Sequence, residues 1–261
     1  MANFQVGGDV ISQQTISCIK DETRTVDLWG PENTFVSPSQ EIDVTASPAS
    51  SVKVKRSSLP IVGRIRKWEF TGLAYGTTRI EAKAGTATWD WFDLEVQPKA
   101  YRFLLPDQKR FLRKLAKEGK PIADKFGYPI SAILACGAAE SRFGMSDIYK
   151  TTKCPFNLQR PDGWTYPSCP TQNISTVNKE GAAAAPAPFC MATDLADATR
   201  LFCEWVKYYP NEGPRNTVIG LKGSPKQFAE KLYLVGFADN RADRTIEYGK
   251  LWESYQFARF D

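Results

Sequence analysis

The chain has 261 residues, of which 42% are hydrophobic and 24% charged, an ordinary globular composition for one large domain or two modest ones. It contains no histidine, which excludes Ser/His and Cys/His catalytic pairs, histidine-ligated zinc and an imidazole general base. The formal net charge is +5, and no apolar run reaches the roughly 18 residues of a membrane span, so we expect no membrane insertion. Residues 1–9 lack the basic and apolar regions of a signal peptide, so none is expected.

The first 98 residues consist of short β-rich runs separated by Gly, Pro, Asn and Ser, without helical periodicity. Strands are predicted at residues 25–29, 41–45, 51–55, 68–70, 78–82 and 91–96. Regularly spaced short strands are typical of a β-sandwich. The segment 72–82, together with Leu94-Glu95-Val96, resembles the closing strands of bacterial immunoglobulin-like domains, which implies that fold for residues 1–98.

From residue 99 the pattern becomes helical, with apolar residues at helical spacing in 108–116, 130–142 and 195–208. The charge changes as well: residues 1–99 carry 11 Lys and Arg against 12 Asp and Glu, whereas residues 100–261 carry 23 against 17. The basic surplus of +6 would favour any polyanion, but we find no nucleic-acid-binding module and expect no nucleic acid partner. A second domain, mainly α-helical, is therefore predicted over residues 99–261.

Six cysteines, at positions 18, 136, 154, 169, 190 and 203, form no C-x-x-C pair, so a structural metal site is not expected. Four of them fall between 154 and 203, in a stretch rich in Pro, Gly and Ala. There the sequence leaves disulfides and thiols equally open. Cys18 and Cys136 are predicted to be buried thiols.

Glu140 is the candidate site residue that the local pattern singles out. We expect a helix to begin near Pro129, with Ser131 available as its cap, and to end before Gly144. Residues 132–139 are apolar on every face, which predicts a buried helix at the centre of the domain. In the last turn, the helix dipole and apolar surroundings disfavour the anion, so a raised pKa suited to a general acid is expected for Glu140. The alternative is a surface glutamate paired with Arg142 or a lysine.

The run from Ile133 to Gly144, followed by Pro155-Phe156-Asn157-Leu158, resembles the glucosaminidase family of peptidoglycan hydrolases, glycoside hydrolase family 73. The Ala-x-Glu-Ser-x-x-Gly pattern carries the resemblance, and weaker similarity follows at 192–202, 234–240 and 248–251. The resemblance covers about residues 105–255. It implies a lysozyme-like helical domain with a small β-hairpin that cleaves the β-1,4 glycan between N-acetylglucosamine and N-acetylmuramic acid. A glycosidase of this kind needs carboxylates and no cofactor or metal.

The resemblance also implies roles for individual residues. Glu140 would be the catalytic acid, and Glu180 is the best match for a second carboxylate on a mobile hairpin, with Asp162 and Asp194 as fallbacks. Phe237 stands where the family usually has a tyrosine, so that hydroxyl is either absent or supplied by Tyr233 or Tyr248. The predicted substrate-binding residues are Ser141, Phe156, Asn157, Trp164, Tyr166, Tyr233, Phe237 and Tyr248.

Phe237 and the divergent region 160–190 motivate an alternative, a non-catalytic cell-wall binding module. Because peptidoglycan lies outside the cytoplasm, three settings fit a chain without a signal peptide. They are a phage tail or lysis protein, a toxin delivered by a secretion apparatus into the periplasm of a rival cell, and a fragment of a longer protein. The expected partners are glycan strands, a secretion or phage-tail component and, for a toxin, a periplasmic immunity protein.

Overall fold

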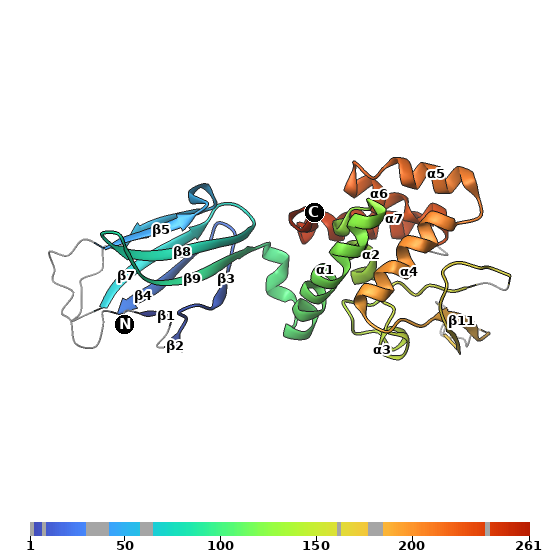
Figure 1. Cartoon of the computed structure of the whole chain (residues 1–261), viewed down its shortest axis with the longest axis horizontal. Coiled ribbons are helices and arrows are strands. Elements are labelled where there is room, and N and C mark those ends of the chain that lie inside the picture. The colour runs from blue at the N-terminus through green and yellow to red at the C-terminus, as the bar shows by residue number, and fades with distance from the viewer. Residues whose placement is uncertain are drawn as a thin grey trace. The chain divides into compact units, whose positions relative to one another are not determined.

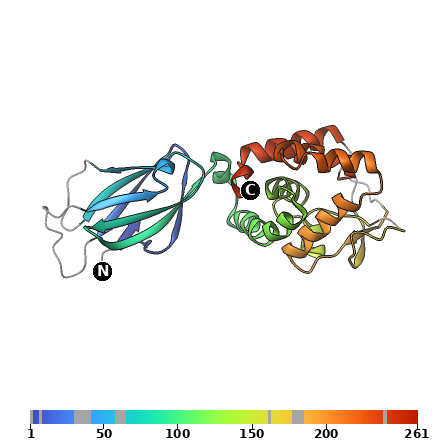
Figure 2. The ribbon, with the colours of Figure 1, turned by 45° about the horizontal axis from the view of Figure 1, so that its top comes forward.

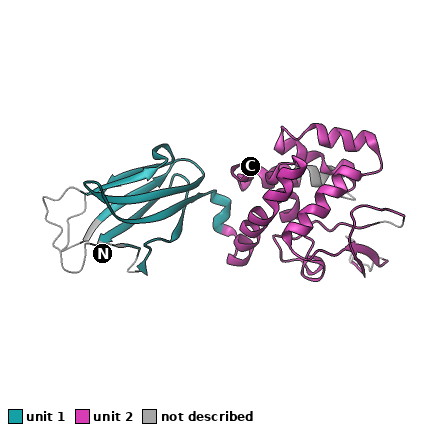
Figure 3. Cartoon of the chain, viewed as in Figure 1, with its two compact units in different colours: residues 1–102 teal, residues 103–261 magenta. Residues whose placement is uncertain are grey.

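The structure is a computed structural model that describes residues 3–6, 9–29, 42–57, 65–160, 163–176, 185–237 and 241–261. The chain divides into two compact units, residues 1–102 and 103–261 (Figures 1 and 3). The boundary expected between residues 98 and 99 falls between β9 (Ala87–Gln97) and the short 3-10 helix η2 (Lys99–Phe103). No helix in the described ranges is both long and apolar enough to cross a membrane.

The first unit contains two β-sheets. One has the strand order β2 (Asp9–Val10), β1 (Asn3–Val6), β4 (Thr23–Trp29), β7 (Ile65–Gly72) and β6 (Val52–Arg56). The other has the order β3 (Thr15–Ile19), β9, β8 (Gly76–Ala84) and β5 (Asp43–Ser47), and the 3-10 turn η1 (Ala49–Ser51) precedes β6. The described neighbours pair antiparallel except β3 and β9, which are parallel. Each predicted strand overlaps one of these strands, although residue 41 lies outside the described ranges.

The two sheets share one apolar core. Phe92 of the second sheet contacts Phe4 and Phe70 of the first, with ring centroids 4.8 and 5.5 Å apart, and all three side chains are fully buried. Aromatic edge-to-face pairs of this kind hold layers together through burial and ring geometry. The unit is therefore a β-sandwich. Its immunoglobulin-like character stays a prediction.

The second unit is mainly helical. Its helices are α1 (Pro106–Phe126), α2 (Ile130–Glu140), α3 (Asp147–Thr152), α4 (Leu195–Tyr208), α5 (Glu212–Gly220), α6 (Pro225–Lys231) and α7 (Arg241–Ser254), with the short 3-10 segments η3 (Leu232–Val235) and η4 (Phe257–Phe260). A two-stranded hairpin, β10 (Thr171–Ile174) and β11 (Ala187–Cys190), accompanies them. Helix α2 packs against α1, α6 and α7 (Figure 2). Every residue from 130 to 138 is buried, as the apolar pattern predicts.

Helix α1 is longer than the predicted 108–116 and continues through Pro121. It begins where Pro106 occupies the first turn and Leu105 N donates to Gln108 Oε1 at 2.9 Å, and it ends at Gly127 with φ +66°. Gly119 allows close contact with α4, because a Cβ there would lie 2.7 Å from Thr199 Oγ1. Packing on α4 thus outweighs the local cost of Pro121.

The expected cap of α2 needs correction. The N-cap residue is Pro129, and Ser131 lies inside the helix. Ser131 N and Ser131 Oγ donate to Asp261 Oδ1 and Oδ2, at 2.9 and 2.5 Å. The carboxylate of Asp261, 130 residues later in the sequence, therefore accepts hydrogen bonds from the first turn of α2. It also places negative charge at the positive end of the helix dipole.

All six cysteines are buried and in the thiol form. This confirms the prediction for Cys18 and Cys136. Of the alternatives left open for the other four, the structure has thiols.

Candidate active site

Glu140 is the last residue of α2, and a tight turn follows it. Ser141 Oγ donates to Gly137 O at 2.5 Å and accepts from Gly144 N at 2.8 Å. At Gly144 φ is +81°, and a Cβ there would lie 2.6 Å from Phe111 Cδ2, so only glycine fits. The turn therefore ends α2 directly after Glu140.

Both carboxylate oxygens of Glu140 accept hydrogen bonds. Tyr248 OH, from the buried side of α7, donates to Oε1 at 2.6 Å, and Asn157 Nδ2 donates to Oε2 at 3.2 Å. Asn157 Nδ2 also donates to the backbone oxygen of Glu140 at 2.8 Å. Asn157 has φ +50°, a left-handed conformation that asparagine tolerates better than most residues. These donors fix the orientation of the carboxyl group.

Glu140 opens onto a cavity of about 410 Å³. Its described lining is Glu140, Ile148, Phe156, Asn157, Leu158, Gln159, Trp164, Thr176, Phe189, Trp205, Tyr209, Gly236 and Phe237. Glu140 is the single acidic residue among these lining residues. Within the described ranges, no group of three or more acidic or cysteine side chains is placed to hold a metal ion.

One wall of the cavity is aromatic. The rings of Trp164 and Trp205 have centroids 4.9 Å apart, and Tyr209 lies edge-on to Trp164 at 5.8 Å. Trp205 Nε1 donates to Val235 O at 2.6 Å, which fixes the indole on the segment that leads to Phe237. A carboxyl group beside large apolar faces is an arrangement suited to acid catalysis on a substrate with an apolar ring face.

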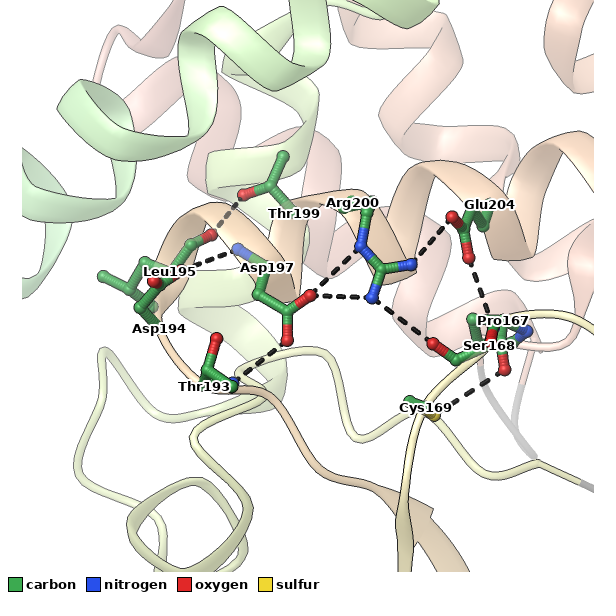
Figure 4. A network of polar contacts seen from close by, with 10 residues as sticks. All are labelled: Pro167, Ser168, Cys169, Thr193, Asp194, Leu195, Asp197, Thr199, Arg200 and Glu204. Atoms are coloured by element: carbon green, nitrogen blue, oxygen red, sulfur yellow. Dashed lines mark hydrogen bonds and ion pairs between the residues drawn. The ribbon is translucent and has the colours of Figure 1, made fainter.

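The loop that carries Trp164 is tied to α4 by a charged network (Figure 4). Arg200 Nη2 donates to Ser168 O at 3.3 Å, and Ser168 N donates to Glu204 Oε2 at 3.2 Å. Arg200 also pairs with Asp197 and Glu204, at 2.7 Å each. These contacts hold the loop in place beside the aromatic wall.

The structure brings together only part of the predicted site. Of its members, Glu140, Phe156, Asn157, Trp164 and Phe237 line the cavity, and Tyr248 lies buried behind Glu140. Tyr248 is thus the tyrosine, of the two considered for the hydroxyl that Phe237 lacks, that reaches Glu140.

Other predicted residues lie away from the cavity lining. Ser141 is fully buried and bonded within its own turn. Tyr166 is exposed and stacks on Tyr208 at 4.1 Å, and Tyr233 is half-buried with Lys231 Nζ 5.8 Å from its ring centre. For these three, the geometry gives no direct role at the cavity.

Three positions were predicted for the second carboxylate, Glu180, Asp162 and Asp194. Asp194 caps α4, since its side chain accepts from Asp197 N at 2.8 Å, and it does not line the cavity. Glu180 and Asp162 lie outside the described residues. Their roles stay predictions.

Sequence reasoning missed several lining residues, including Trp205, Tyr209, Gln159 and Thr176. Trp205 lies in the last turn of α4 and Tyr209, four residues later, is its C-cap residue, so helical spacing would have placed both rings on one face. Gln159 and Thr176 carried no such signal, because both lie outside the helices and strands, Gln159 in an isolated bridge to Phe189.

No family model matches the chain, and no curated protein matches it. Solved structures do. The catalytic domain of the autolysin Auto from Listeria monocytogenes is 13% identical with a TM-score of 0.45, over 62% of this chain and 93% of that one. A truncated glycoside hydrolase domain of FlgJ from Salmonella typhimurium is 20% identical with a TM-score of 0.43, over 56% and 95%.

A peptidoglycan hydrolase from Sphingomonas sp. A1 is 17% identical with a TM-score of 0.45, over 58% of this chain and 91% of that one. By their names, these neighbours include glycoside hydrolase and peptidoglycan hydrolase domains. All three likenesses are weak, with identities below 25% and TM-scores below 0.5.

Proposed function

We propose that residues 103–261 hydrolyse glycosidic bonds in the glycan backbone of peptidoglycan, with Glu140 as the general acid. The placement of Glu140 carries the proposal: its carboxyl group lies at a cavity with an aromatic wall and is oriented by Tyr248 and Asn157. The substrate class follows from the resemblance of the Glu140 segment to family 73 glucosaminidases. An N-acetylglucosaminidase or muramidase with a lysozyme-like fold is the enzyme type proposed.

In this mechanism, Glu140 begins as the carboxylic acid and gives its proton to the oxygen that leaves the scissile bond. The C1–O bond breaks, positive charge develops on the sugar, and Glu140 becomes a carboxylate. Tyr248 OH and Asn157 Nδ2 already point at the two oxygens, so they stabilise the negative charge left on Glu140. The aromatic wall offers ring faces on which the apolar face of a pyranose can pack.

Completion of the displacement requires a water nucleophile activated by a second carboxylate, or the acetamido oxygen of the substrate itself. We propose Glu180 for the first route. Thr176, four residues earlier, lines the cavity and leads toward that segment. If the acetamido group of the substrate completes the displacement, Glu180→Gln should cleave glycan as fast as the wild type. If Glu180 activates water, the variant should lose glycan cleavage.

The experiment that tests the proposal compares Glu140→Gln with Glu212→Gln on purified peptidoglycan. Glu212 is exposed at the start of α5 and is not among the described lining residues of the cavity, so it is a matched control for the loss of one carboxylate. We expect the Glu140 variant to bind the polymer and release no soluble fragments, while the control matches the wild type. Binding by the wild type without release would instead show the non-catalytic binding module.

Peptidoglycan lies outside the cytoplasm, so the proposed place of action is the cell wall, in the periplasm of a target cell or as part of a phage lysis system. A bacteriolytic effector would require a secretion or phage-tail component for delivery, and an immunity protein in the cell that produces it. Co-purification of the chain with products of neighbouring genes tests these partners. A tight complex that blocks glycan cleavage would identify the immunity protein.

A further inference from the structure

Two buried cysteines meet at the open end of the β10–β11 hairpin. The side chains of Cys169 and Cys190 interact, since each is the largest influence on the pKa of the other, and Cys169 Sγ also donates to Pro167 O at 3.7 Å. The strand register sets Thr171 opposite Cys190, and Met191 N donates to Pro170 O at 2.9 Å, so the ladder extends toward Cys169. Because side chains alternate along a strand, Cys169 and Thr171 share a face, and Cys190 lies on it too.

We propose that Cys169 and Cys190 form a disulfide bond when the protein meets an oxidant. The bridge would close the segment between them, which contains the hairpin and Thr176 of the cavity lining. It would join the end of the loop that carries Trp164 to strand β11. A covalent bond would then hold together the two chain segments on that side of the cavity.

The surroundings give the two thiols different roles. The side-chain interaction with Cys190 lowers the pKa of Cys169, and the positive charges of Arg160 and Arg200 act in the same direction. The side-chain interaction with Cys169, followed by burial, raises the pKa of Cys190. Arg160 Nη1 donates to Cys169 O at 2.8 Å, and Arg200 holds the preceding residue through Ser168 O (Figure 4). These influences make Cys169 the more acidic of the two thiols, and so the one that attacks the oxidant first.

The oxidant is a small-molecule disulfide such as oxidised glutathione. Cys169 releases its proton to solvent, and its thiolate attacks one sulfur of that disulfide, whose S–S bond breaks and releases one glutathione thiolate. The Cys190 thiol then loses its proton to solvent and attacks Cys169 Sγ, forming the protein disulfide and releasing the second glutathione thiolate. Two protein thiols are oxidised, and one glutathione disulfide is reduced to two thiols.

Two other thiols of this unit, Cys154 and Cys203, are less suited to the reaction. Burial raises the pKa of Cys154 to about 12, and burial likewise raises the pKa of Cys203 on α4. Both therefore stay protonated and are poor nucleophiles at neutral pH. Cys154 interacts electrostatically with Cys169 and Cys190, which makes it the competing partner that an experiment must distinguish.

The test incubates the full chain with oxidised or reduced glutathione, blocks remaining thiols with N-ethylmaleimide in denaturant, and measures intact mass and cross-linked peptides. After oxidation we expect two fewer blocked thiols than the six of the reduced chain, and a peptide that joins Cys169 to Cys190. The oxidised form should also melt higher by about 5–10 °C, since the loop closed is of moderate length. Blocking of all six thiols, or a bridge to Cys154, overturns the proposal.

Two serine variants complete the design. Cys190→Ser should lose both the bridge and the rise in melting temperature. Cys203→Ser, which removes another buried thiol on α4, should keep both. If Cys190→Ser does not fold, the peptide map of the wild-type chain decides alone.

Discussion

At the scale of single residues, Glu140 is defined by its hydrogen-bond partners. Asn157, in the loop after α3, is 17 residues from Glu140 in sequence, whereas Tyr248, on α7, is 108 residues away. The apolar helix and the Glu-Ser-x-x-Gly pattern were enough to predict Glu140 and its place at the end of α2. The tyrosine that would reach it stayed open between Tyr233 and Tyr248, because that choice depends on how α7 packs on α2.

Tyr248→Phe removes the donor to Glu140 Oε1 and keeps the buried ring. The lost hydrogen bond stabilises charge that forms on Glu140 during proton transfer, so we expect kcat to fall about 10- to 100-fold with KM changed less than about twofold. Steady-state kinetics on soluble glycan fragments measure both. Tyr128→Phe, at a tyrosine just before the N-terminus of α2, is the matched control and should leave both kcat and KM unchanged. An equal loss in both variants would contradict the role of Tyr248.

At the scale of elements, α2 shows what local sequence predicts well and what it misses. Its apolar pattern predicted its start and burial, although the predicted range 130–142 runs two residues past the end of α2 at Glu140, and α4 was predicted over its whole range. The cap of α2 could not be read locally, because Asp261, its hydrogen-bond acceptor, is 130 residues away from Ser131. Helix α1 was predicted too short, since Pro121 is a helix breaker unless tertiary packing outweighs its cost.

Asp261→Ala should therefore destabilise the helical unit. It leaves Ser131 N and Ser131 Oγ without their shared acceptor and removes negative charge from the helix N-terminus. A loss of about 1–3 kcal/mol in the free energy of unfolding is expected from urea titration. Asp261→Asn keeps one oxygen acceptor and should lose less. Asp147→Ala, at an exposed side chain, should change stability by less than about 0.5 kcal/mol, and a similar loss there would contradict the account.

At the scale of the whole molecule, the change from β-rich to helical periodicity near residue 98 lies close to the division between the compact units at 102. The sequence pattern predicts strands but not which strands pair with each other. The parallel pairing of β3 with β9 joins segments more than 70 residues apart, for example Thr15 and Asp93, and only the packed sandwich sets it. Pairing of that kind depends on the whole core rather than on local preference.

We expect the buried thiols to lower the free energy of unfolding at alkaline pH. Burial raises the pKa of Cys154 to about 12 from 9.0, so as pH rises the unfolded chain releases this proton before the folded chain does. Its contribution is complete below pH 9 and is lost as pH rises toward 12, about 3 kcal/mol by pH 11. Urea unfolding at pH 8 and 11 with reductant present measures the fall. Cys154→Ser should show a smaller fall by that amount, and an unchanged fall would exclude the thiol as its cause.

Glycan cleavage through Glu140 is tested most directly by the end groups of the products. Purified peptidoglycan is digested with wild-type protein or with Glu140→Gln, reduced with borohydride, and analysed by mass spectrometry. Wild type should create newly reducible N-acetylglucosamine or N-acetylmuramic acid ends, and the variant should create none. Anhydro ends would contradict hydrolysis, and new reducing ends from both proteins would contradict the role of Glu140. An intact glycan in both digests would contradict glycosidase activity.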